Sequence, residues 1–438
     1  ARASPDRQRV KTLAPLFLAL IAAIAPAAAQ QAEPLRVGVS GDYPPFSFAS
    51  EEDPRKLEGF DLAVGRAYAA DRHRRLDIVG FRWPELLSDL AADRFDVAMS
   101  GITIRPERSI AGIFTIPVVA SGAVVLARED AGFADLASLD HPAARIAVNQ
   151  GGHLERVSRV HFRSATLIAI PENAAVRGAL LSGEVDAAVT DTLEAPIWLE
   201  GSEGIVQLGP FTRDLKAYLV HPDRGELAAD LDAWLVARES DGTLAELRRR
   251  HLGYGDSPPT AEPVSALLAA VDERLDLMPL VAEAKRATDT PVTVPEREAR
   301  VIEAALEATR RAARDAHLTP FSERTIRAFF EAQIEAAKEI QRATLAGAAG
   351  EAPTADLDAA LRPALLRIGN RIAFLLPKLP GRIDAPGLEA RARERLHTPG
   401  LSDGARDALV EAILALSASQ PGEPEAAGRR EGMRRPAS

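Results

Sequence analysis

The pattern of strand-like and helix-like segments changes once along the chain, near residue 253, and this change constrains the fold more than any other feature. Before it, short β-branched runs alternate with helical stretches, which is typical of an α/β fold with largely parallel sheets. After it, Ala, Leu, Glu and Arg recur at helical spacing and no convincing strand interrupts them. We therefore predict an α/β domain over residues 30–253 and an all-helical domain over residues 264–419.

The elements of the first half are predicted from periodicity. Strands are expected at Leu35–Val39, Asp96–Ser100, Arg145–Asn149, Leu167–Ile170, Val185–Thr190 and Lys216–Val220. Helices are expected at Gly59–Ala70, Trp83–Ala92, Asn173–Ser182 and Leu227–Arg250. In the second half, breaks rich in Pro and Gly are expected near residues 289–295, 346–355 and 377–387.

The two ends and the junction differ from these domains. Arg9 and Lys11 precede an apolar run and a small-residue end, which is typical of a secretory signal peptide over residues 1–29. An uncleaved N-terminal anchor is the alternative. We therefore expect export to the periplasm and no membrane contact after cleavage. Residues 254–263 are expected to be a linker, and residues 420–438 a disordered tail.

Charge and cysteine content exclude several classes of protein. The 438 residues include 53 Lys and Arg against 63 Asp and Glu, a net charge of −10 with histidines neutral. This balance argues against a nucleic-acid partner, which usually meets a basic face. The absence of cysteine excludes disulfides, thiolate nucleophiles, Cys-ligated zinc and iron–sulfur clusters. No metal site is predicted.

Polar residues follow one of the predicted strands and form a candidate anion site. Ser100 and Thr103 can offer hydroxyl and backbone donors beyond the strand end, where open α/β sheets bind ligands. Pro106-Glu107-Arg108 is expected to continue this loop, and Arg108 can add a fork of donors matched to a carboxylate. The alternative is a surface arginine in a turn, and the local pattern leaves both open.

A longer set of segments adds to this candidate site. They are Gly41-Asp42-Tyr43-x-Pro45-Phe46-Ser47, Trp83-Pro84, Asp93-Arg94-Phe95-Asp96-x-Ala98-Met99-Ser100-Gly101-Ile102, Val148-Asn149-x-Gly151-Gly152 and Lys216-Ala217-Tyr218-Leu219. They resemble the two-lobed periplasmic solute-binding proteins for polar amino acids, over about residues 35–253. They are more similar still to one enzymatic branch, the cyclohexadienyl (prephenate/arogenate) dehydratases.

The segment Thr190-Asp191-x-x-Glu194 favours the enzymatic branch. A binding protein needs the aspartate, which commonly grips a ligand amine in that family, but it has no need of a second carboxylate. The resemblance implies that Glu194 is the acid that protonates the departing ring hydroxyl. It also implies that the substrate carboxylates are held by Arg108, Ser100, Thr103 and Asn149, with Lys216 and Tyr43 as further cleft candidates.

Two features keep other interpretations open. Glu194 can also be a solvated carboxylate at the start of a helix. His153 and Leu154 stand where the dehydratase family usually has a small hydroxyl residue and an amide. His153 can donate to a carboxylate or simply tolerate solvent, so this departure weakens the substrate assignment but not the fold.

In the helical half, Arg274 and Lys285 are eleven residues apart, which places them on one face of a continuous helix. Pro279 lies between them and can kink this helix or end it early. Gln341 lies on a long predicted helix from Glu323 to Thr344. Isolated Arg and Lys side chains are usually solvated, so spacing alone does not establish a pocket.

The wider pattern of this half is more informative. Its segments are Glu273-Arg274-Leu275, Val281-Ala282-x-x-Lys285, Arg297-Glu298-x-x-Val301, Phe330-x-x-Gln333-Ile334-Glu335-Ala336-x-Lys338-x-Ile340-Gln341 and Leu361-Arg362-Pro363. They resemble the secreted, all-helical chorismate mutases. The resemblance implies that Arg274, Arg297 and Arg362 clamp the two substrate carboxylates. It further implies that Lys285 and Gln341 donate to the ether oxygen and that Glu298 contacts the ring hydroxyl.

Together the resemblances imply consecutive reactions of phenylalanine biosynthesis. The second domain would convert chorismate to prephenate, and the first would convert prephenate to phenylpyruvate or arogenate to phenylalanine, with no cofactor in either step. Two alternatives remain: an amino-acid-binding protein with a helical partner domain, and a mutase with a degenerate binding-protein half. The sequence leaves open whether the chain forms a homo-oligomer.

Overall fold

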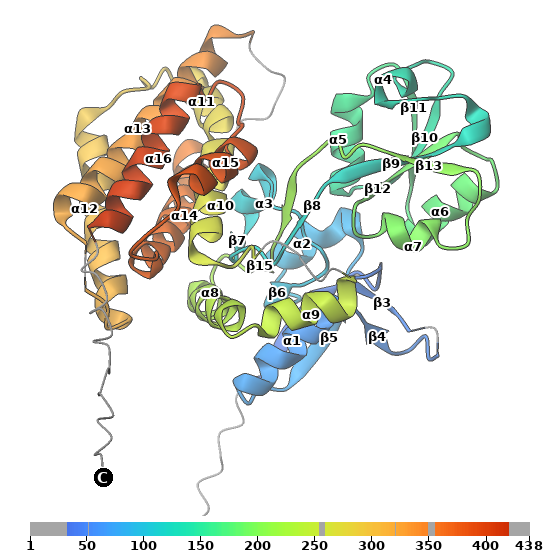
Figure 1. Ribbon diagram of the computed structural model, residues 1–438, viewed down its shortest axis with the longest axis horizontal. Coiled ribbons are helices and arrows are strands. Elements are labelled where there is room, and N and C mark those ends of the chain that lie inside the picture. Colours follow the sequence, from blue (N-terminus) through green and yellow to red (C-terminus); the bar gives the residue numbers. More distant parts are fainter. Residues whose placement is uncertain (1–32, 51, 254–258, 320, 349–354, 420–438) are drawn as a thin grey trace, which may run out of the picture.

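The structure is a computed structural model that describes residues 33–50, 52–253, 259–319, 321–348 and 355–419. It consists of two α/β lobes and a helical domain (Figure 1). The predicted signal peptide, the predicted tail and the first half of the predicted linker lie outside the described residues. Among the described residues, none of the helices has the length and apolar character needed to cross a membrane.

Lobe 1 is built on a five-stranded sheet of order β5-β1-β6-β15-β7, in which β1 pairs in parallel with β5 and β6. A small sheet of order β2-β3-β4 lies beside it. The strands are β1 (Leu35–Val39), β2 (Asp42–Tyr43), β3 (Ser47–Ala49), β4 (Leu57–Glu58), β5 (Leu76–Gly80), β6 (Val97–Ala98), β7 (Ile113–Phe114) and β15 (Leu219–Val220). The helices are α1 (Phe60–Asp71), η1 (Trp83–Glu85), α2 (Leu86–Ala91), α3 (Pro106–Ala111), α8 (Gly225–Ser240) and α9 (Thr243–Leu252).

Lobe 2 repeats the architecture with a sheet of order β11-β10-β12-β9-β13. β10 is parallel to β11 and β12, whereas β9 is antiparallel to its neighbours. The strands are β9 (Ala123–Arg128), β10 (Arg145–Asn149), β11 (Thr166–Ile170), β12 (Ala187–Asp191) and β13 (Ile205–Leu208). The helices are η2 (Glu129–Ala131), α4 (Leu136–Leu139), α5 (His153–His161), α6 (Asn173–Leu181) and α7 (Ala195–Leu199).

Two crossing strands join the lobes. β8 (Val119–Ser121) carries the chain from lobe 1 to lobe 2, and β14 (Asp214–Lys216) carries it back. They pair antiparallel, with Lys216 opposite Val119. Side chains of β14 therefore lie between the lobes, where Asp214 and Lys216 line a cavity.

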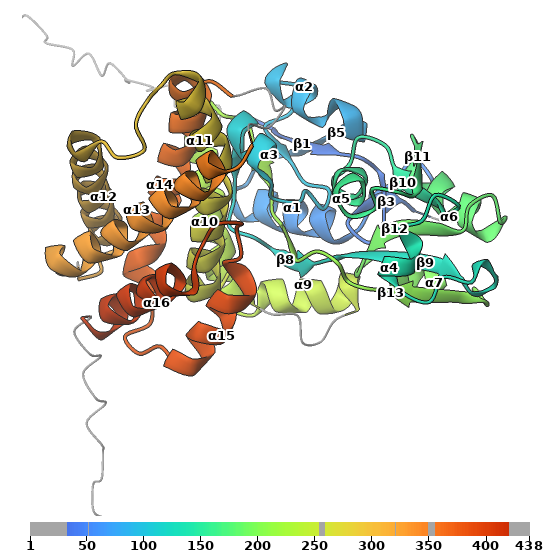
Figure 2. The same cartoon turned by 90° about the horizontal axis from the view of Figure 1, so that it is seen from above.

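Every element of the helical domain within the described residues is helical, which agrees with the predicted fold class. The helices are α10 (Pro263–Asp276), α11 (Met278–Ala287), α12 (Pro295–Asp315), α13 (Glu323–Ala346), a π-helical turn η3 (Leu357–Leu361), α14 (Arg362–Leu375), η4 (Leu376–Lys378), α15 (Ala385–Arg395) and α16 (Asp403–Ala418). They pack beside lobe 1 and away from lobe 2 (Figures 1 and 2). Three of the breaks between them fall in the regions that the sequence predicted, whereas the breaks between α12 and α13 and between α15 and α16 were not predicted.

Three local predictions are wrong. The single strand expected over Lys216–Val220 is divided between β14, which ends at Lys216, and β15 (Leu219–Val220), in different sheets. The single helix expected over Leu227–Arg250 is two helices, because Gly242 adopts a left-handed φ of 83° and ends the first. The expected loop around Arg108 is the helix α3, whose first position is Pro106, a favoured residue there. At Pro279, where the sequence left a kink or an early end open, the helix ends early, since α10 ends at Asp276 and Lys285 lies on α11.

The helical domain and lobe 1 share one continuous apolar core, whereas lobe 2 has two clusters of its own. Two arginines of α14 add hydrogen bonds to lobe 1 beside this apolar contact. Arg367 donates to the carbonyl oxygens of Ser109, Ile110 and Gly112, at 3.0–3.3 Å, at the end of α3. The helical domain therefore forms one packing unit with lobe 1.

Arg371 makes the most buried polar link of this interface. It donates to the Phe114 carbonyl oxygen and forms an ion pair with Glu273 of α10, and both side chains are at least nine-tenths buried. We expect Arg371→Met to lower the free energy of unfolding by about 3–5 kcal/mol, because it leaves Glu273 buried without a cation. Urea unfolding followed by circular dichroism measures this loss.

The matched control is Arg393→Met, since the ion pair between Arg393 and Glu389 is exposed. We expect it to cost less than about 1 kcal/mol. The double variant Arg371→Met/Glu273→Leu should recover most of the lost stability, because it removes both charges. Equal losses for Arg371→Met and Arg393→Met would contradict the role given to Arg371.

Candidate active sites

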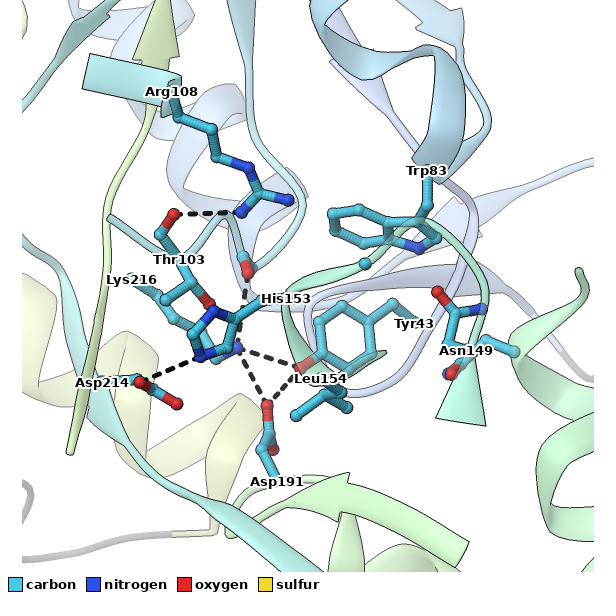
Figure 3. A pocket seen from close by; sticks show the side chains of 13 residues that line it. Tyr43, Trp83, Thr103, Arg108, Asn149, His153, Leu154, Asp191, Asp214 and Lys216 are labelled. Atoms are coloured by element: carbon cyan, nitrogen blue, oxygen red, sulfur yellow. Dashed lines mark hydrogen bonds and ion pairs between the residues drawn. The ribbon is translucent and has the colours of Figure 1, made fainter. Parts of the chain in front are cut away.

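The first candidate site is the cleft between the lobes (Figure 3). Its side chains come mainly from the ends of strands and the turns that follow, where open α/β sheets place ligands. The cavity measures about 30 Å³, which holds only about two water molecules. A larger ligand therefore needs the lobes or the lining side chains to move apart. The lining residues are Tyr43, Trp83, Gly101, Thr103, Arg108, Asn149, Gly152, His153, Leu154, Asn173, Asp191, Asp214 and Lys216.

Arg108 is a buried cation that forms no ion pair with the described residues. Its side chain lies against the Trp83 ring, with 5.9 Å between the guanidinium carbon and the ring centre. One terminal nitrogen donates to the Thr103 carbonyl oxygen at 3.0 Å, and its Nε has no partner among the described residues. Burial lowers the pKa of Arg108 well below its ordinary value, although an arginine remains charged in proteins. The cleft therefore holds a guanidinium that is free to bind an anion.

Asp191 is held by two side chains of the cleft and by two backbone N–H groups of its own turn. Its Oδ2 accepts a hydrogen bond from the Tyr43 hydroxyl and lies 2.9 Å from Lys216 Nζ. Its Oδ1 accepts from the backbone N–H groups of Leu193 and Glu194 at 2.8 and 3.0 Å. Burial alone would raise the pKa of Asp191, but the charge of Lys216 and these hydrogen bonds hold it below its ordinary value. Asp191 is therefore a paired anion.

Glu194, at the N-terminus of α7, is fully buried rather than solvated. Its Oε1 lies 2.7 Å from Asn173 Nδ2, and its Oε2 lies 2.6 Å from the Thr190 hydroxyl. Burial, followed by the charge of Asp191, raises the pKa of the Glu194 carboxyl well above its ordinary value. The protonated form is therefore favoured, as an acid catalyst requires.

The structure separates the predicted cleft residues into two groups. Tyr43, Thr103, Arg108, Asn149, Asp191 and Lys216 line the cavity. Ser100 does not, because its hydroxyl is hydrogen-bonded to Ser40 and Ser47 inside lobe 1. Glu194 lies behind the wall, and the residue that joins it to the cavity is Asn173. Sequence reasoning missed Asn173, since it was assigned only to the start of a helix.

His153 lies inside the cleft and is paired. Its Nε2 lies 3.0 Å from Asp214 Oδ1, and Asp214 Oδ2 accepts from the Thr212 hydroxyl at 2.8 Å. Burial lowers the pKa of His153 below its ordinary value, against the opposing effect of Asp214. Its Nδ1 has no partner among the described residues and can donate to or accept from a ligand. Asp214 was not predicted, because no motif marks it.

The second candidate site is a cavity of about 570 Å³ inside the helical domain. It is lined by the predicted residues Arg274, Lys285, Arg297, Glu298, Gln341 and Arg362. They come from α10, α11, α12, α13 and α14, so the structure places around one cavity the residues that the resemblance assigned to one site. The remaining wall is mostly aliphatic, with Val281, Ile334 and Leu365 among its members.

The basic side chains of this cavity repel one another. Burial lowers the pKa of Arg274 to about 10. Burial, together with the charges of Arg297 and Arg362, lowers the pKa of Lys285. A concave site with several desolvated cations is poised for a ligand with more than one anionic group. Arg274 Nε has no partner among the described residues.

Several site residues are held by neighbours. Lys285 Nζ donates to the Val292 carbonyl oxygen at 2.9 Å, and Arg362 forms an ion pair with Asp358. Gln341 Nε2 donates to the Ala337 carbonyl oxygen at 3.1 Å, and its Oε1 is unpaired among the described residues.

Glu298 binds protein groups on both of its oxygens. Its Oε1 accepts from the backbone N–H of Val294 at 3.2 Å, and its Oε2 from Lys338 Nζ at 3.2 Å. Lys338 and Arg300 also line the cavity but were not predicted as site residues. The described part of the chain, this cavity included, holds no group of three or more acidic or histidine side chains placed to bind a metal ion.

Comparison with known families identifies a different family for each half of the chain. Residues 35–254 match the model of the bacterial extracellular solute-binding proteins, family 3, and residues 265–342 match that of chorismate mutase type II. The cyclohexadienyl dehydratase of Pseudomonas aeruginosa is 33% identical over 225 residues, which cover 50% of this chain and 83% of that protein. The arginine-binding protein 1 of an Escherichia coli ABC transporter is 28% identical over 245 residues, covering 53% and 96%.

Among solved structures, an ancestral amino acid-binding protein described as a precursor of cyclohexadienyl dehydratase is 28% identical, with a TM-score of 0.47. It covers 50% of this chain and 95% of that one. The family matches confirm both resemblances and the fold class predicted from the sequence. The site residues remain predictions.

Proposed function

The chain belongs to the bacterial extracellular solute-binding proteins of family 3, and from this membership, its chorismate mutase type II segment and its two pockets we propose an exported bifunctional enzyme. The helical domain rearranges chorismate to prephenate. The two-lobed domain then removes CO2 and water from prephenate or arogenate, which completes an aromatic ring. Both steps belong to phenylalanine biosynthesis.

The observation that carries this proposal is the buried Glu194 carboxyl behind a cleft that contains Arg108, whose Nε has no partner among the described residues. In the dehydration, the bond between the ring and its carboxylate breaks, and its electron pair enters the ring. The carbon–oxygen bond of the ring hydroxyl breaks at the same time. Hydroxide is a poor leaving group, so the Glu194 proton is transferred to that oxygen and water departs.

Other cleft residues hold the substrate. Arg108 and Asn149 each have one nitrogen without a partner among the described residues, and they donate to the substrate carboxylates from the cavity wall. Asn173 holds the Glu194 carboxyl in place. Since the ring becomes aromatic, no cofactor is needed, and the Glu194 carboxyl regains its proton from solvent after each turnover.

The mutase reaction needs no proton transfer, so its residues act by position and charge. Arg274, Arg297 and Arg362 fix the two carboxylates of chorismate in the compact conformer that rearranges. Lys285 and Gln341 donate to the ether oxygen as negative charge develops on it. Glu298 contacts the ring hydroxyl.

The decisive experiment adds chorismate to the purified chain and follows both chorismate loss and phenylpyruvate formation. Conversion of chorismate to prephenate without further reaction would favour a mutase with a degenerate first half. This alternative is kept because His153 and Leu154 depart from the dehydratase pattern. Consumption of neither chorismate nor prephenate, with binding of an amino acid in calorimetry, would favour a binding protein like the Escherichia coli relative. Export is tested separately by fractionation of cells that produce the full-length protein.

The raised pKa of Glu194 predicts the pH dependence of the dehydration. The acid works only while protonated, so kcat/KM should be highest below its pKa and fall about tenfold per pH unit above it. Because burial raises this pKa, activity should extend to a higher pH than an ordinary glutamic acid allows. Initial rates with prephenate across neutral pH measure this. Activity that rises with pH through the same range would argue that Glu194 acts as a base.

A further inference from the structure

The short helix α3, which carries Arg108, depends on other parts of the molecule for its stability. It has only six residues, and an isolated helix of that length is unstable in water. At its end the Gly112 N–H donates to the Arg108 carbonyl oxygen at 2.9 Å. The last carbonyl groups of a helix have no N–H partner within the same helix, so those that follow Arg108 need donors from elsewhere.

Arg367 of α14 supplies these donors from the helical domain. Its Nη2 lies 3.2 Å from the Ser109 carbonyl oxygen, 3.0 Å from that of Ile110 and 3.3 Å from that of Gly112. A cation at the C-terminal end of a helix also interacts favourably with the helix dipole. In both views α3 lies at the side of lobe 1 that faces α10 and α14 (Figures 1 and 2). The helical domain therefore completes the end of α3.

Arg367 makes this contact without lining either candidate site. On the same helix, Leu366, Gly369 and Asn370 line the cavity of the helical domain, whereas Arg367 lines neither that cavity nor the cleft. Its guanidinium meets lobe 1 instead. A substitution of Arg367 therefore removes no wall residue of either site.

The start of α3 meets lobe 2. Glu107 forms an ion pair with Arg156 of α5 at 2.5 Å, and Arg105, just before α3, donates to the Gly152 carbonyl oxygen at 3.5 Å. The helix is thus held by lobe 2 at its start and by the helical domain at its end, with Arg108 between these contacts. A shift of α3 would displace the Arg108 guanidinium from a bound ligand, and a misplacement of about 1 Å can cost about 100-fold in rate.

From this arrangement we infer that Arg367, a residue of the helical domain, is a positioning residue for the reaction in the cleft. It fixes the end of α3 and thereby holds Arg108 where the substrate carboxylate binds. The inference rests on the proposed dehydration. Arg108 holds the carboxylate before and during the reaction, so its displacement should weaken substrate binding more than the chemical step. Glu194 lies in lobe 2, away from this contact, so its proton transfer should be unaffected.

Arg367→Met tests the inference in the full chain, with prephenate supplied as the substrate. We expect the KM for prephenate to rise about tenfold, while kcat changes less than twofold and the pH dependence of kcat keeps its midpoint. The mutase rate with chorismate should also be unchanged. An unchanged KM, or a loss of kcat at constant KM, would overturn the inference. A parallel loss of the mutase rate would show a merely structural role and would overturn it too.

Two further variants separate this role from a general weakening of the helical domain. Arg367→Lys should recover part of the lost binding, because an ammonium group can still donate to the carbonyl oxygens. Arg286→Met is the matched control, since Arg286 donates to the Thr344 carbonyl oxygen at 3.1 Å near the end of α13, entirely within the helical domain. It should leave the KM for prephenate unchanged. An equal rise in KM for Arg286→Met and Arg367→Met would overturn the inference.

The double variant Arg108→Met/Arg367→Met tests whether Arg367 acts through Arg108. In the Arg108→Met chain, the further change of Arg367 should lower kcat/KM by less than about twofold, because contributions made through one group do not add. A further tenfold decrease would overturn the inference. If Arg367→Met does not fold, Arg367→Gln is measured in its place with the same expectation. Failure of the unchanged chain to consume prephenate would instead overturn the proposed function.

Discussion

Glu194→Gln is expected to reduce prephenate dehydration by a factor of about 10²–10⁴ while chorismate is still converted to prephenate at the original rate. Glutamine fills the same space and can still meet Asn173 and Thr190, but it carries no acidic proton for the departing hydroxyl. The substitution also leaves no new charge, so the fold should be retained. Prephenate is therefore expected to accumulate when chorismate is supplied.

The measurement follows chorismate, prephenate and phenylpyruvate together in one reaction. Glu200→Gln is the matched control, since Glu200 lies at the other end of α7 and its side chain is exposed. It should leave both rates unchanged. Equal dehydration by Glu194→Gln and the unchanged chain would remove Glu194 from the proposed chemistry, and loss of both activities in a folded variant would argue against separate sites.

Arg297→Ala should have the converse effect and reduce the mutase rate by about 10²–10³ while leaving prephenate dehydration unchanged. Arg297 lies at the start of α12 on the wall of the 570 Å³ cavity. Its loss removes donors for a substrate carboxylate and weakens the field that stabilises the developing charge. It is less buried than Arg274, so its removal should disturb the packing less.

Arg314→Ala provides the control for this variant, because Arg314 is exposed in the last turn of the same helix. Initial rates of chorismate loss are compared for the two variants. A normal mutase rate for Arg297→Ala would place the reaction elsewhere. A decrease of both activities to the same extent would indicate unfolding or coupling between the domains rather than a local effect.

Much of the fold could be predicted because it depends on local pattern. The strand Leu35–Val39 and the strand Arg145–Asn149 have the bounds that their β-branched runs predicted. Errors occurred where a single residue set the boundary of a helix. Gly242 divides one predicted helix into two, and Pro106 begins a helix within a predicted loop.

The site predictions depended on motifs. A motif identifies residues in the sequence, but it does not show which other side chains they contact in the fold. Ser100 belongs to a motif, but its hydroxyl is directed into lobe 1. Asn173 and Asp214 belong to none, yet they line the cleft. Asn173 contacts Glu194 across 21 positions of the chain, a separation at which no periodicity predicts contact.

The sequence by itself determined the two-part architecture, the two families and most residues of both pockets, because periodicity and family motifs are properties of neighbouring residues. Only the tertiary structure decided which groups are charged, paired or free. Asp191 and Lys216 are 25 positions apart, and Tyr43 lies in the other lobe, yet the three share one buried hydrogen-bond network. Burial and distance set the charge of Glu194, and the hydrogen-bond network of Asp191 forms only where the two lobes meet.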